Sequence, residues 1–227
     1  MAGGRVVVVT GAFGVLGSAV AKAAVASGAR VALVDFAQEA PAGVGEMARG
    51  GVDLADTAAA EGALTAVADK LGGIDALLNI AGGFRWETLE GGSVDNWSQL
   101  YRLNVVTAAN ASRAALPYLK KSAHGRIVNV GSAAALKSGM GMGAYAASKS
   151  GVHRLTESLA EELKGDNVTV NAVLPSIIDT PVNRADMPEA DFKTWVAPAD
   201  LAKVILFLAS PDASPVTGAL VPVTGRV

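Results

Sequence analysis

The residues best suited to chemistry in this sequence are Tyr145 and Lys149, four positions apart in the stretch GAYAASKSGVHRL at 143–155. On a helix, this spacing brings two side chains to one face. An ammonium about 5 Å from a phenol contributes on the order of 3 kcal/mol at an effective dielectric of about 20, or about two pKa units. Burial opposes this effect, and we expect the charge to outweigh it. The pattern predicts a proton-transfer pair, although two amphipathic side chains on a surface helix would share the spacing.

A second chemical signal is a set of three glycines in TGAFGVLG at 10–17, between an apolar strand expected over 5–10 and a helix expected over 15–28. Glycine lets the backbone turn sharply and lie against a pyrophosphate, whose charge then faces the amides of the helix N-terminus. A glycine-rich turn used only for packing is the alternative. The predicted cofactor contacts in this turn are Gly11, Phe13, Gly14, Val15, Leu16 and Gly17.

Two aspartates follow the next expected strands. Asp35 ends the second strand, where a carboxylate accepts hydrogen bonds from ribose hydroxyls and repels a 2′-phosphate. No Arg or Lys occurs at 36–38 or within the glycine turn, so we predict NAD(H) in preference to NADP(H). Asp53 and its neighbour Leu54 are predicted cofactor contacts near the adenine, and an N-cap role for Asp53 in the helix expected from residue 55 remains open.

Short β-branched runs alternate with longer helical stretches along the chain. Strands are expected over 5–10, 30–35, 50–54, 74–82, 125–132, 167–175 and 219–223, and helices over 15–28, 55–71, 95–121, 144–164 and 198–209. Repeated βα units require a parallel sheet with helices on both faces. We therefore predict an α/β, doubly wound, Rossmann-like fold in a single domain over 1–227. Ligands bind such sheets at the carboxyl ends of the strands, where the strand order reverses.

The composition argues against several other classes of protein. A formal net charge of −2 over 227 residues gives no general attraction for nucleic acid or acidic membranes. The absence of cysteine excludes a disulfide framework and a thiolate metal site, and we expect no metal. His124 and His153 are far apart, and we expect both to be isolated and exposed. The N-terminus lacks the pattern of a signal peptide and the apolar runs are short, so we expect a cytoplasmic protein without a membrane span.

Taken together, the motifs resemble the short-chain dehydrogenase/reductase family (classical type). The three glycines, NIAG at 79–82, Asn104, Ser132 and the Tyr145–Lys149 pair occur in the order and spacing of that family, and 214–225 resembles its closing segment. The resemblance covers essentially the whole chain. It implies an oxidoreductase that transfers hydride between a nicotinamide cofactor and a carbonyl compound or secondary alcohol.

The resemblance also implies roles for individual residues. Tyr145 would be the acid and base, Ser132 would hydrogen-bond the substrate oxygen, and Asn104 would hold a water that relays protons to Lys149. Ser176 stands where the family usually has glycine, which concerns only the local backbone. Further implied cofactor contacts are Ala81, Gly82, Lys149, Pro175, Ile178 and Thr180, with Thr180 facing the nicotinamide carboxamide.

Two alternative functions remain open. The stretch 174–195, the glycine spacing and AGGF at 81–84 resemble quinonoid dihydropteridine reductases, a branch of the same family. Typical members of that branch lack the serine that this chain has at Ser132. A non-catalytic NAD-binding sensor or scaffold is the alternative from another class, and the presence of both Tyr145 and Lys149 argues against it.

The segment 181–197 is predicted to be a lid over the substrate. Its aromatic residues Phe192 and Trp195 favour a flat or apolar small-molecule substrate. The resemblance further implies a homodimer or homotetramer, with the helix expected over 144–164 and the preceding long helix pairing across a two-fold axis.

Overall fold

The computed structural model describes residues 4–227. In this part of the chain, seven parallel strands form one sheet in the order β3-β2-β1-β4-β5-β6-β7. The strands are β1 (Val6–Thr10), β2 (Arg30–Val34), β3 (Met47–Arg49), β4 (Ala76–Asn79), β5 (Gly125–Val130), β6 (Val168–Pro175) and β7 (Leu220–Val223). The strand order reverses between β1 and β4, which defines the crevice where such sheets bind ligands.

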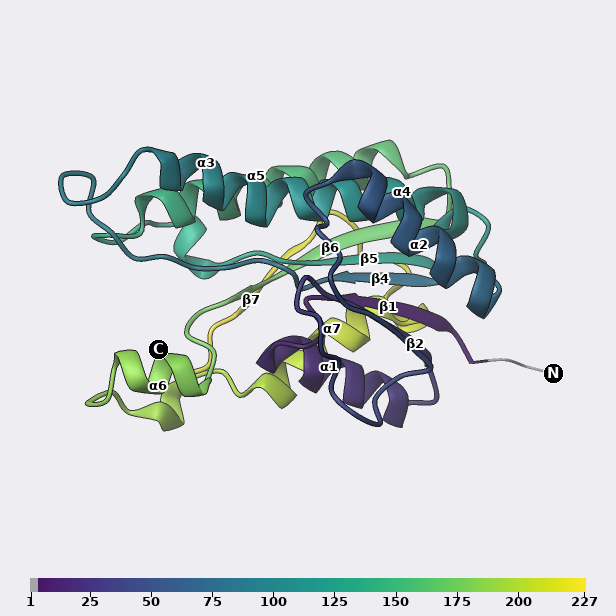
Figure 1. The fold of residues 1–227 in the computed structure, drawn as a ribbon, viewed down its shortest axis with the longest axis horizontal. Helices are drawn as coiled ribbons and strands as arrows, with labels where there is room; N and C mark the ends of the chain where they lie inside the picture. The colour runs from purple at the N-terminus through teal and green to yellow at the C-terminus, as the bar shows by residue number, and fades with distance from the viewer. Residues whose placement is uncertain (1–3) are drawn as a thin grey trace.

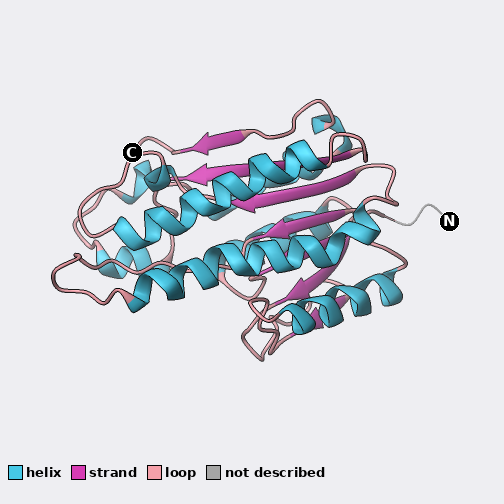
Figure 2. Ribbon diagram, turned by 90° about the horizontal axis from the view of Figure 1, so that it is seen from above, coloured by secondary structure: helices cyan, strands magenta, loops and turns pink. Residues whose placement is uncertain are grey.

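Helices cover both faces of the sheet (Figure 1). Helices α2, α4 and α5 lie on one face and α1 and α7 on the other, and Figure 2 shows the strands running side by side beneath the first group. The helices are α1 (Val15–Ala26), α2 (Thr57–Leu71), α3 (Asp95–Tyr101), α4 (Thr107–Leu119), α5 (Gly143–Glu162), α6 (Pro181–Asp186) and α7 (Pro198–Ala209). The predicted doubly wound α/β fold is confirmed. No helix of the described residues combines the length and apolar character needed to cross a membrane.

Strand β1 shows why these apolar runs form central strands. All five of its residues are buried. Because side chains alternate across a strand, Val6 and Val8 pack into the core beneath α2 and α4, whereas Val7 and Val9 pack into the core beneath α1 and α7. A strand buried on both faces reads as a continuous apolar run rather than an alternating one.

Three predicted elements differ from the structure. The strand expected over 50–54 is wrong, because the strand is β3, and Gly51 just beyond it turns with a φ of +71°. The helix expected over 95–121 is divided into α3 and α4 by a π-helical segment, η1 (Arg102–Val106). The segment 181–197 contains α6 and a short 3-10 helix, η3 (Phe192–Thr194), rather than only loop.

The turn between β1 and α1 depends on two of its three glycines. Gly11 has a φ of +61°, and a Cβ atom there would lie 2.7 Å from the Ala81 Cα. A Cβ atom on Gly17 would lie 2.1 Å from the Gly11 carbonyl oxygen. At Gly14 the nearest atom to an added Cβ would be that same oxygen at 3.5 Å, an ordinary contact. The first and third glycines are therefore required by close packing, whereas the second has room for a Cβ atom.

This difference predicts unequal effects of two alanine substitutions. Gly17→Ala forces backbone atoms apart and should lower the free energy of unfolding by about 1–3 kcal/mol. Gly14→Ala, which creates no such clash, should lower it by less than about 1 kcal/mol. Urea unfolding of both variants measures the difference, and equal losses would contradict this account of the turn.

Candidate active site

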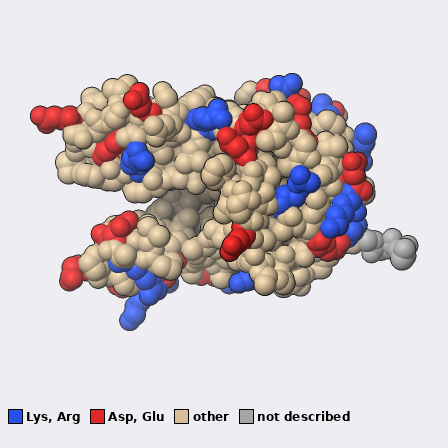
Figure 3. All heavy atoms as spheres, viewed as in Figure 1, with Lys and Arg blue, Asp and Glu red and all other residues tan. Residues whose placement is uncertain are grey.

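A cleft of about 1480 Å³ follows the carboxyl edge of the sheet. Figure 3 shows it opening between a lobe that carries α3 and α5 and a lobe that carries α6. Every residue predicted to contact the cofactor lines this cleft, as do three of the four predicted catalytic residues. The exception is Asn104, which is buried behind the wall. The structure therefore brings the predicted residues together in one place.

The glycine turn forms one end of the cleft, where α1 begins. Gly14 is the N-cap residue of α1, no side chain caps the helix, and no acidic residue occurs in its first turn. The first amides of a helix lack intrahelical acceptors and carry the positive end of the helix dipole. Because Gly14, Val15 and Leu16 line the cleft, this end fits the pyrophosphate of a dinucleotide.

Asp35 lies beside this turn and helps to fix it. One carboxylate oxygen accepts a hydrogen bond from the Phe13 N–H at 2.8 Å, and the other accepts one from the Ala37 N–H at 3.0 Å. The neighbouring Phe36 side chain is exposed. Asp35 is thus positioned by the backbone of the turn while it lines the cleft.

Asp53 lines the same end but does not cap α2. Its carboxylate accepts a hydrogen bond from the Ala55 N–H at 2.9 Å and lies 3.2 Å from the Arg102 guanidinium. The N-cap residue of α2 is Asp56, which accepts from the Ala59 N–H at 2.8 Å. The alternative of an N-cap role for Asp53 is therefore wrong. No sequence pattern indicated Arg102, because this residue comes to Asp53 from a distant helical segment.

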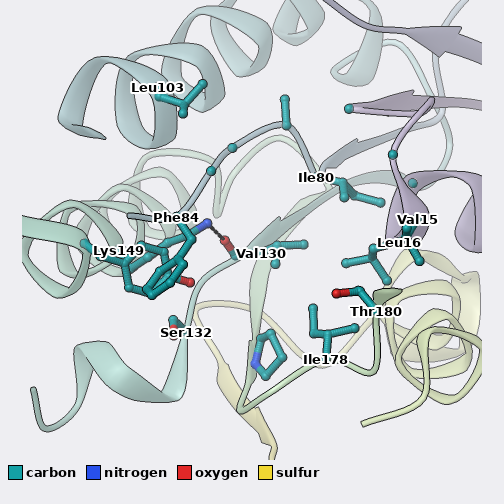
Figure 4. Close-up of a pocket in the computed structure, with 18 of the residues that line it drawn as sticks. Val15, Leu16, Ile80, Phe84, Leu103, Val130, Ser132, Lys149, Ile178 and Thr180 are labelled. Atoms are coloured by element: carbon teal, nitrogen blue, oxygen red, sulfur yellow. Dashed lines mark hydrogen bonds between the residues drawn. The ribbon is translucent and has the colours of Figure 1, made fainter. Parts of the chain in front are cut away.

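Lys149 lies deep in the cleft wall. Its ammonium donates a hydrogen bond to the Val130 carbonyl oxygen at 2.8 Å, and its side chain is only 6% exposed. Figure 4 shows this bond, with Phe84 and Ser132 nearby. Removal from water disfavours the charged form and lowers the pKa of Lys149 to about 8.

Tyr145 lies one turn earlier on α5, with its ring partly covered by Phe84. The two ring centroids are 4.9 Å apart and the ring planes meet at 87°, an edge-to-face contact. Burial raises the pKa of the Tyr145 hydroxyl, and its hydrogen bond with Ser132 opposes the rise. The expectation that the lysine charge outweighs burial is therefore wrong for the protein by itself. The cleft wall removes water that would otherwise stabilise the phenolate.

Asn104 lies in the π-helical segment η1 and joins two parts of the site. Its side-chain oxygen accepts a hydrogen bond from the Gly83 N–H at 2.9 Å, and its amide nitrogen donates to the Ser148 hydroxyl at 2.9 Å. A Cβ atom on Gly82 would lie 2.5 Å from the Asn104 oxygen and 3.4 Å from the Lys149 ammonium nitrogen. The segment after β4 thus passes between Asn104 and Lys149. The water-relay role of Asn104 stays a prediction.

A chain of buried polar groups fixes α5 to the sheet. The Asn79 amide on β4 donates to the Asn129 side-chain oxygen on β5 at 2.9 Å. The Asn129 amide in turn donates to the Thr156 hydroxyl on α5 at 2.8 Å, and that hydroxyl donates to the Val152 carbonyl at 2.8 Å. Because buried polar groups cost free energy when unpaired, this chain favours one position of the helix that carries Tyr145.

His153 is a residue of the site that our sequence reasoning missed. It was expected to be exposed, yet it is 2% exposed, and its Nε2 atom accepts a hydrogen bond from the Ser132 N–H at 3.4 Å. Burial, followed by the nearby charges of Arg154 and Lys149, lowers the pKa of His153. Its spacing could have revealed it, because it lies four positions after Lys149 on one helix face. His124 is exposed, as expected.

The lid segment also differs in detail from the prediction. Phe192 and Trp195 pack on each other with ring centroids 4.8 Å apart, and neither lines the cleft. The cleft is instead lined by Val182 and Met187 from the α6 region. Thr180 caps α6 by accepting from the Asn183 N–H at 3.2 Å.

Ser176, which stands where the family usually has glycine, fits without backbone strain. Among residues 4–227, Asn167 is the non-glycine residue with a positive φ, so Ser176 does not adopt the left-handed conformation that favours glycine. Its hydroxyl donates to the Thr224 carbonyl oxygen at 2.7 Å and ties the end of β6 to the C-terminal segment.

Comparisons with known proteins find similar dehydrogenases and reductases. A model of the short chain dehydrogenase family matches residues 5–191. The meso-2,3-butanediol dehydrogenase of Serratia marcescens is 36% identical over 97% of this chain and 93% of its own length. A 3-oxoacyl-[acyl-carrier-protein] reductase of Vibrio cholerae is 33% identical over 98% of this chain and 96% of its own. The ligand-free structure of Thermoplasma acidophilum aldohexose dehydrogenase superposes with a TM-score of 0.89 at 28% identity, covering 98% of this chain and 93% of that one.

The burial of Lys149 predicts a characteristic dependence of stability on pH. Its pKa in the folded protein, about 8, lies below its ordinary 10.5, so the unfolded chain binds more protons between these values. The free energy of unfolding should therefore rise with pH in this window, by about 2 kcal/mol from about pH 7 to about pH 9.5.

Urea unfolding of the wild type and Lys149→Met at both pH values isolates this contribution, because the methionine variant lacks the titrating group. Lys203→Met removes an exposed lysine and serves as the matched control. The wild type and the control should gain stability relative to Lys149→Met. The same pH dependence in all three proteins would show that Lys149 titrates normally.

Proposed function

Because the chain belongs to the short-chain dehydrogenase/reductase family, an oxidoreductase family, we propose that it transfers hydride between NAD(H) and a carbonyl compound or secondary alcohol, with Tyr145 as acid and base. One observation carries this proposal. The Tyr145 and Ser132 hydroxyls lie in the same cleft as the buried ammonium of Lys149 and a helix N-terminus that fits a dinucleotide.

In this proposal, Ser132 and Tyr145 bind the oxygen of the substrate carbonyl. When bound, NAD(H) supplies hydride to the substrate carbon or accepts it. During reduction, Tyr145 donates its hydroxyl proton to the substrate oxygen, which becomes the alcohol, and a phenolate remains. During oxidation, the phenolate takes the proton from the alcohol. Such positioned proton transfer contributes about 10²- to 10⁴-fold in rate.

The pKa shifts support different roles for the Tyr145 hydroxyl and the Lys149 ammonium. Burial keeps the Tyr145 hydroxyl protonated near neutral pH, which suits a proton donor. With a pKa of about 8, Lys149 is mostly charged at pH 7, and its charge stabilises the phenolate that forms after proton transfer. Stabilising the phenolate lowers the pKa of the phenol, so in this proposal the lysine charge opposes the effect of burial on Tyr145 without outweighing it.

The cofactor end supports a preference for NAD(H). We propose that Asp35 accepts hydrogen bonds from the ribose hydroxyls, because its carboxylate lines the cleft beside the turn. Arg102, which lines this end, is paired with Asp53. A 2′-phosphate would thus meet a carboxylate at Asp35, and the positive charge nearby already has an acidic partner.

Family membership also supports assembly and location. We propose a homodimer or homotetramer in which α4 and α5 pair across a two-fold axis, and a cytoplasmic protein formed by one domain over 1–227. The likeness of 174–195 to quinonoid dihydropteridine reductases stays a prediction, and a quinonoid dihydropterin belongs among the assayed substrates.

The central test is Tyr145→Phe, which removes the proposed proton donor and keeps the ring packed against Phe84. With a panel of ketones and a quinonoid dihydropterin, NADH absorbance should show a kcat about 10²- to 10⁴-fold below the wild type. The Kd for NADH should change by less than about twofold, because the substitution leaves the glycine turn intact.

Tyr118→Phe is the matched control, because the Tyr118 hydroxyl is bound to Thr65 and does not line the cleft. Equal rates for Tyr145→Phe and the control would remove Tyr145 as the acid. Turnover of the dihydropterin alone would favour the pterin reductase, and tight NADH binding with no turnover would favour the non-catalytic sensor.

The cofactor preference is tested by Asp35→Asn, which removes the charge and keeps a side-chain oxygen as an acceptor. The ratio of kcat/KM for NADPH over NADH should rise about tenfold, equivalent to about 1.4 kcal/mol. Adding Phe36→Arg should raise it further, because the guanidinium would bind the 2′-phosphate. A wild type that already prefers NADPH would contradict the proposed role of Asp35.

A further inference from the structure

The part of the cleft beyond Tyr145 is built from apolar side chains. Phe84 lies edge-on against the Tyr145 ring, and its side chain is 53% exposed to the cleft and solvent. Trp86 follows on the same segment, and its indole N–H donates to the Met140 carbonyl oxygen at 3.0 Å. The polar atom of Trp86 is therefore occupied within the wall. Its ring, which lines the cleft, remains available for contact.

The segment that carries these rings is held firmly in place. The Glu87 N–H donates to the Gly141 carbonyl oxygen at 3.0 Å, which ties the segment to the loop before α5. A Cβ atom on Gly141 would lie 2.1 Å from the Trp86 ring, so the ring packs directly on that backbone. Because its position is fixed by packing, this wall forms a preorganised surface beside the proton donor.

Across the cleft, the α6 region supplies a second apolar wall. Val182 and Met187 line it. Figure 3 shows the visible walls of the cleft as mostly uncharged surface. In Figure 4, Phe84, Ser132 and Lys149 lie at one side of the cleft, apart from Val15, Leu16 and Thr180, so the aromatic wall stands at the catalytic end rather than at the glycine turn.

Charge is scarce at this catalytic end. Of the charged residues that line the cleft, Asp35, Asp53 and Arg102 belong to the glycine-turn end, and Lys149 is buried against Val130. The remaining one is Asp186, whose carboxylate would repel an anionic substrate.

The arginines near the opening are engaged elsewhere. Arg184 forms two hydrogen bonds with Asp179, at 2.6 and 2.8 Å, and its guanidinium lies 4.8 Å from the centre of the Phe192 ring. Arg85 donates to the Asn96 side-chain oxygen. Within the described residues that line the catalytic end, Lys149 is therefore the one cation, and its ammonium is buried and hydrogen-bonded to the Val130 carbonyl oxygen rather than exposed to a carboxylate or phosphate.

From this arrangement we infer that the substrate is an uncharged ketone, or the corresponding secondary alcohol, with a flat body the size of an aromatic ring that packs against Phe84 and Trp86. The inference rests on the proposed function, because it places the reacting carbonyl at Ser132 and Tyr145. Exposed aromatic side chains beside a reactive polar group are suited to this recognition, since they bury apolar area and hold it in a fixed orientation.

Four related compounds separate the effects of charge and ring. Ethyl benzoylformate is neutral and carries a phenyl ring, benzoylformate is its anion, and ethyl pyruvate and pyruvate carry a methyl group in place of the ring. With NADH near pH 7, kcat/KM for ethyl benzoylformate should exceed those for benzoylformate and ethyl pyruvate by at least about tenfold each. An equal or higher value for benzoylformate or for ethyl pyruvate would overturn the inference.

Two variants test the walls directly. Phe84→Ala should lower the ratio of kcat/KM for ethyl benzoylformate over ethyl pyruvate by at least about fivefold, whereas Leu89→Ala, on the same segment but outside the cleft wall, should preserve that ratio. Met187→Lys should raise the ratio for benzoylformate over its ester by at least about fivefold, because the ammonium would meet the carboxylate. Unchanged ratios in both wall variants would contradict the assignment.

A binding measurement separates failure of this inference from failure of the proposed function. Ethyl benzoylformate should quench tryptophan fluorescence of the NADH complex, and Trp86→Phe should abolish most of that quenching. Quenching without turnover of any of the four compounds would overturn the proposed function and keep the inferred binding preference. If ethyl benzoylformate causes no quenching and is not turned over, the inference is overturned.

Discussion

The site depends on one buried interaction, the hydrogen bond between the Lys149 ammonium and the Val130 carbonyl oxygen. Taking a charge out of water is costly unless it is hydrogen-bonded, and the depressed pKa of Lys149 is the measure of that cost. The same bond ties α5 to the end of β5, and thereby sets Tyr145 opposite Ser132. Burial of this cation lowers the local stability, and it holds the cation where the proposed mechanism forms a phenolate.

The two ends of the cleft are built by different physical means. The glycine turn relies on backbone amides and on close approach that side chains would prevent, so its geometry follows from a short stretch of sequence. The catalytic end relies on side chains from several distant segments, held by the polar chain through Asn79, Asn129 and Thr156 and by the packing of Trp86 on the loop before α5. In the proposed function, the substrate therefore contacts side chains from distant segments, whereas the pyrophosphate of the cofactor contacts the backbone of one short turn.

This difference explains what could be predicted from the sequence. The parallel sheet, the turn at Gly11 and the Tyr145–Lys149 pair follow from local patterns, because strand burial, glycine geometry and helical spacing are properties of neighbouring residues. The burial of His153 was missed because it was judged as a lone residue rather than by its register on α5. The orientation of Phe192 away from the cleft depends on its packing with Trp195 and Arg184, which no local pattern encodes.

The pairing of Arg102 with Asp53 belongs to the same group of unpredictable features, since the two residues lie far apart in the chain. So does the apolar wall at Phe84, which becomes recognisable only when the ring is seen against Tyr145. The strand expected over 50–54 failed for a local reason instead, because the glycine-rich start of that stretch ends the strand early.

The π-helical segment η1 changes the phase of the long helix that contains it. A π turn holds one residue more than an α turn, which offsets the side chains before and after it by about 100°. With this offset, the two halves of one continuous helix pack on different neighbours, since α3 packs on α5 whereas α4 packs on α2. A regular α-helix with the same number of residues would lack this offset, so its side chains after η1 would turn by about 100° and α4 would rotate away from α2.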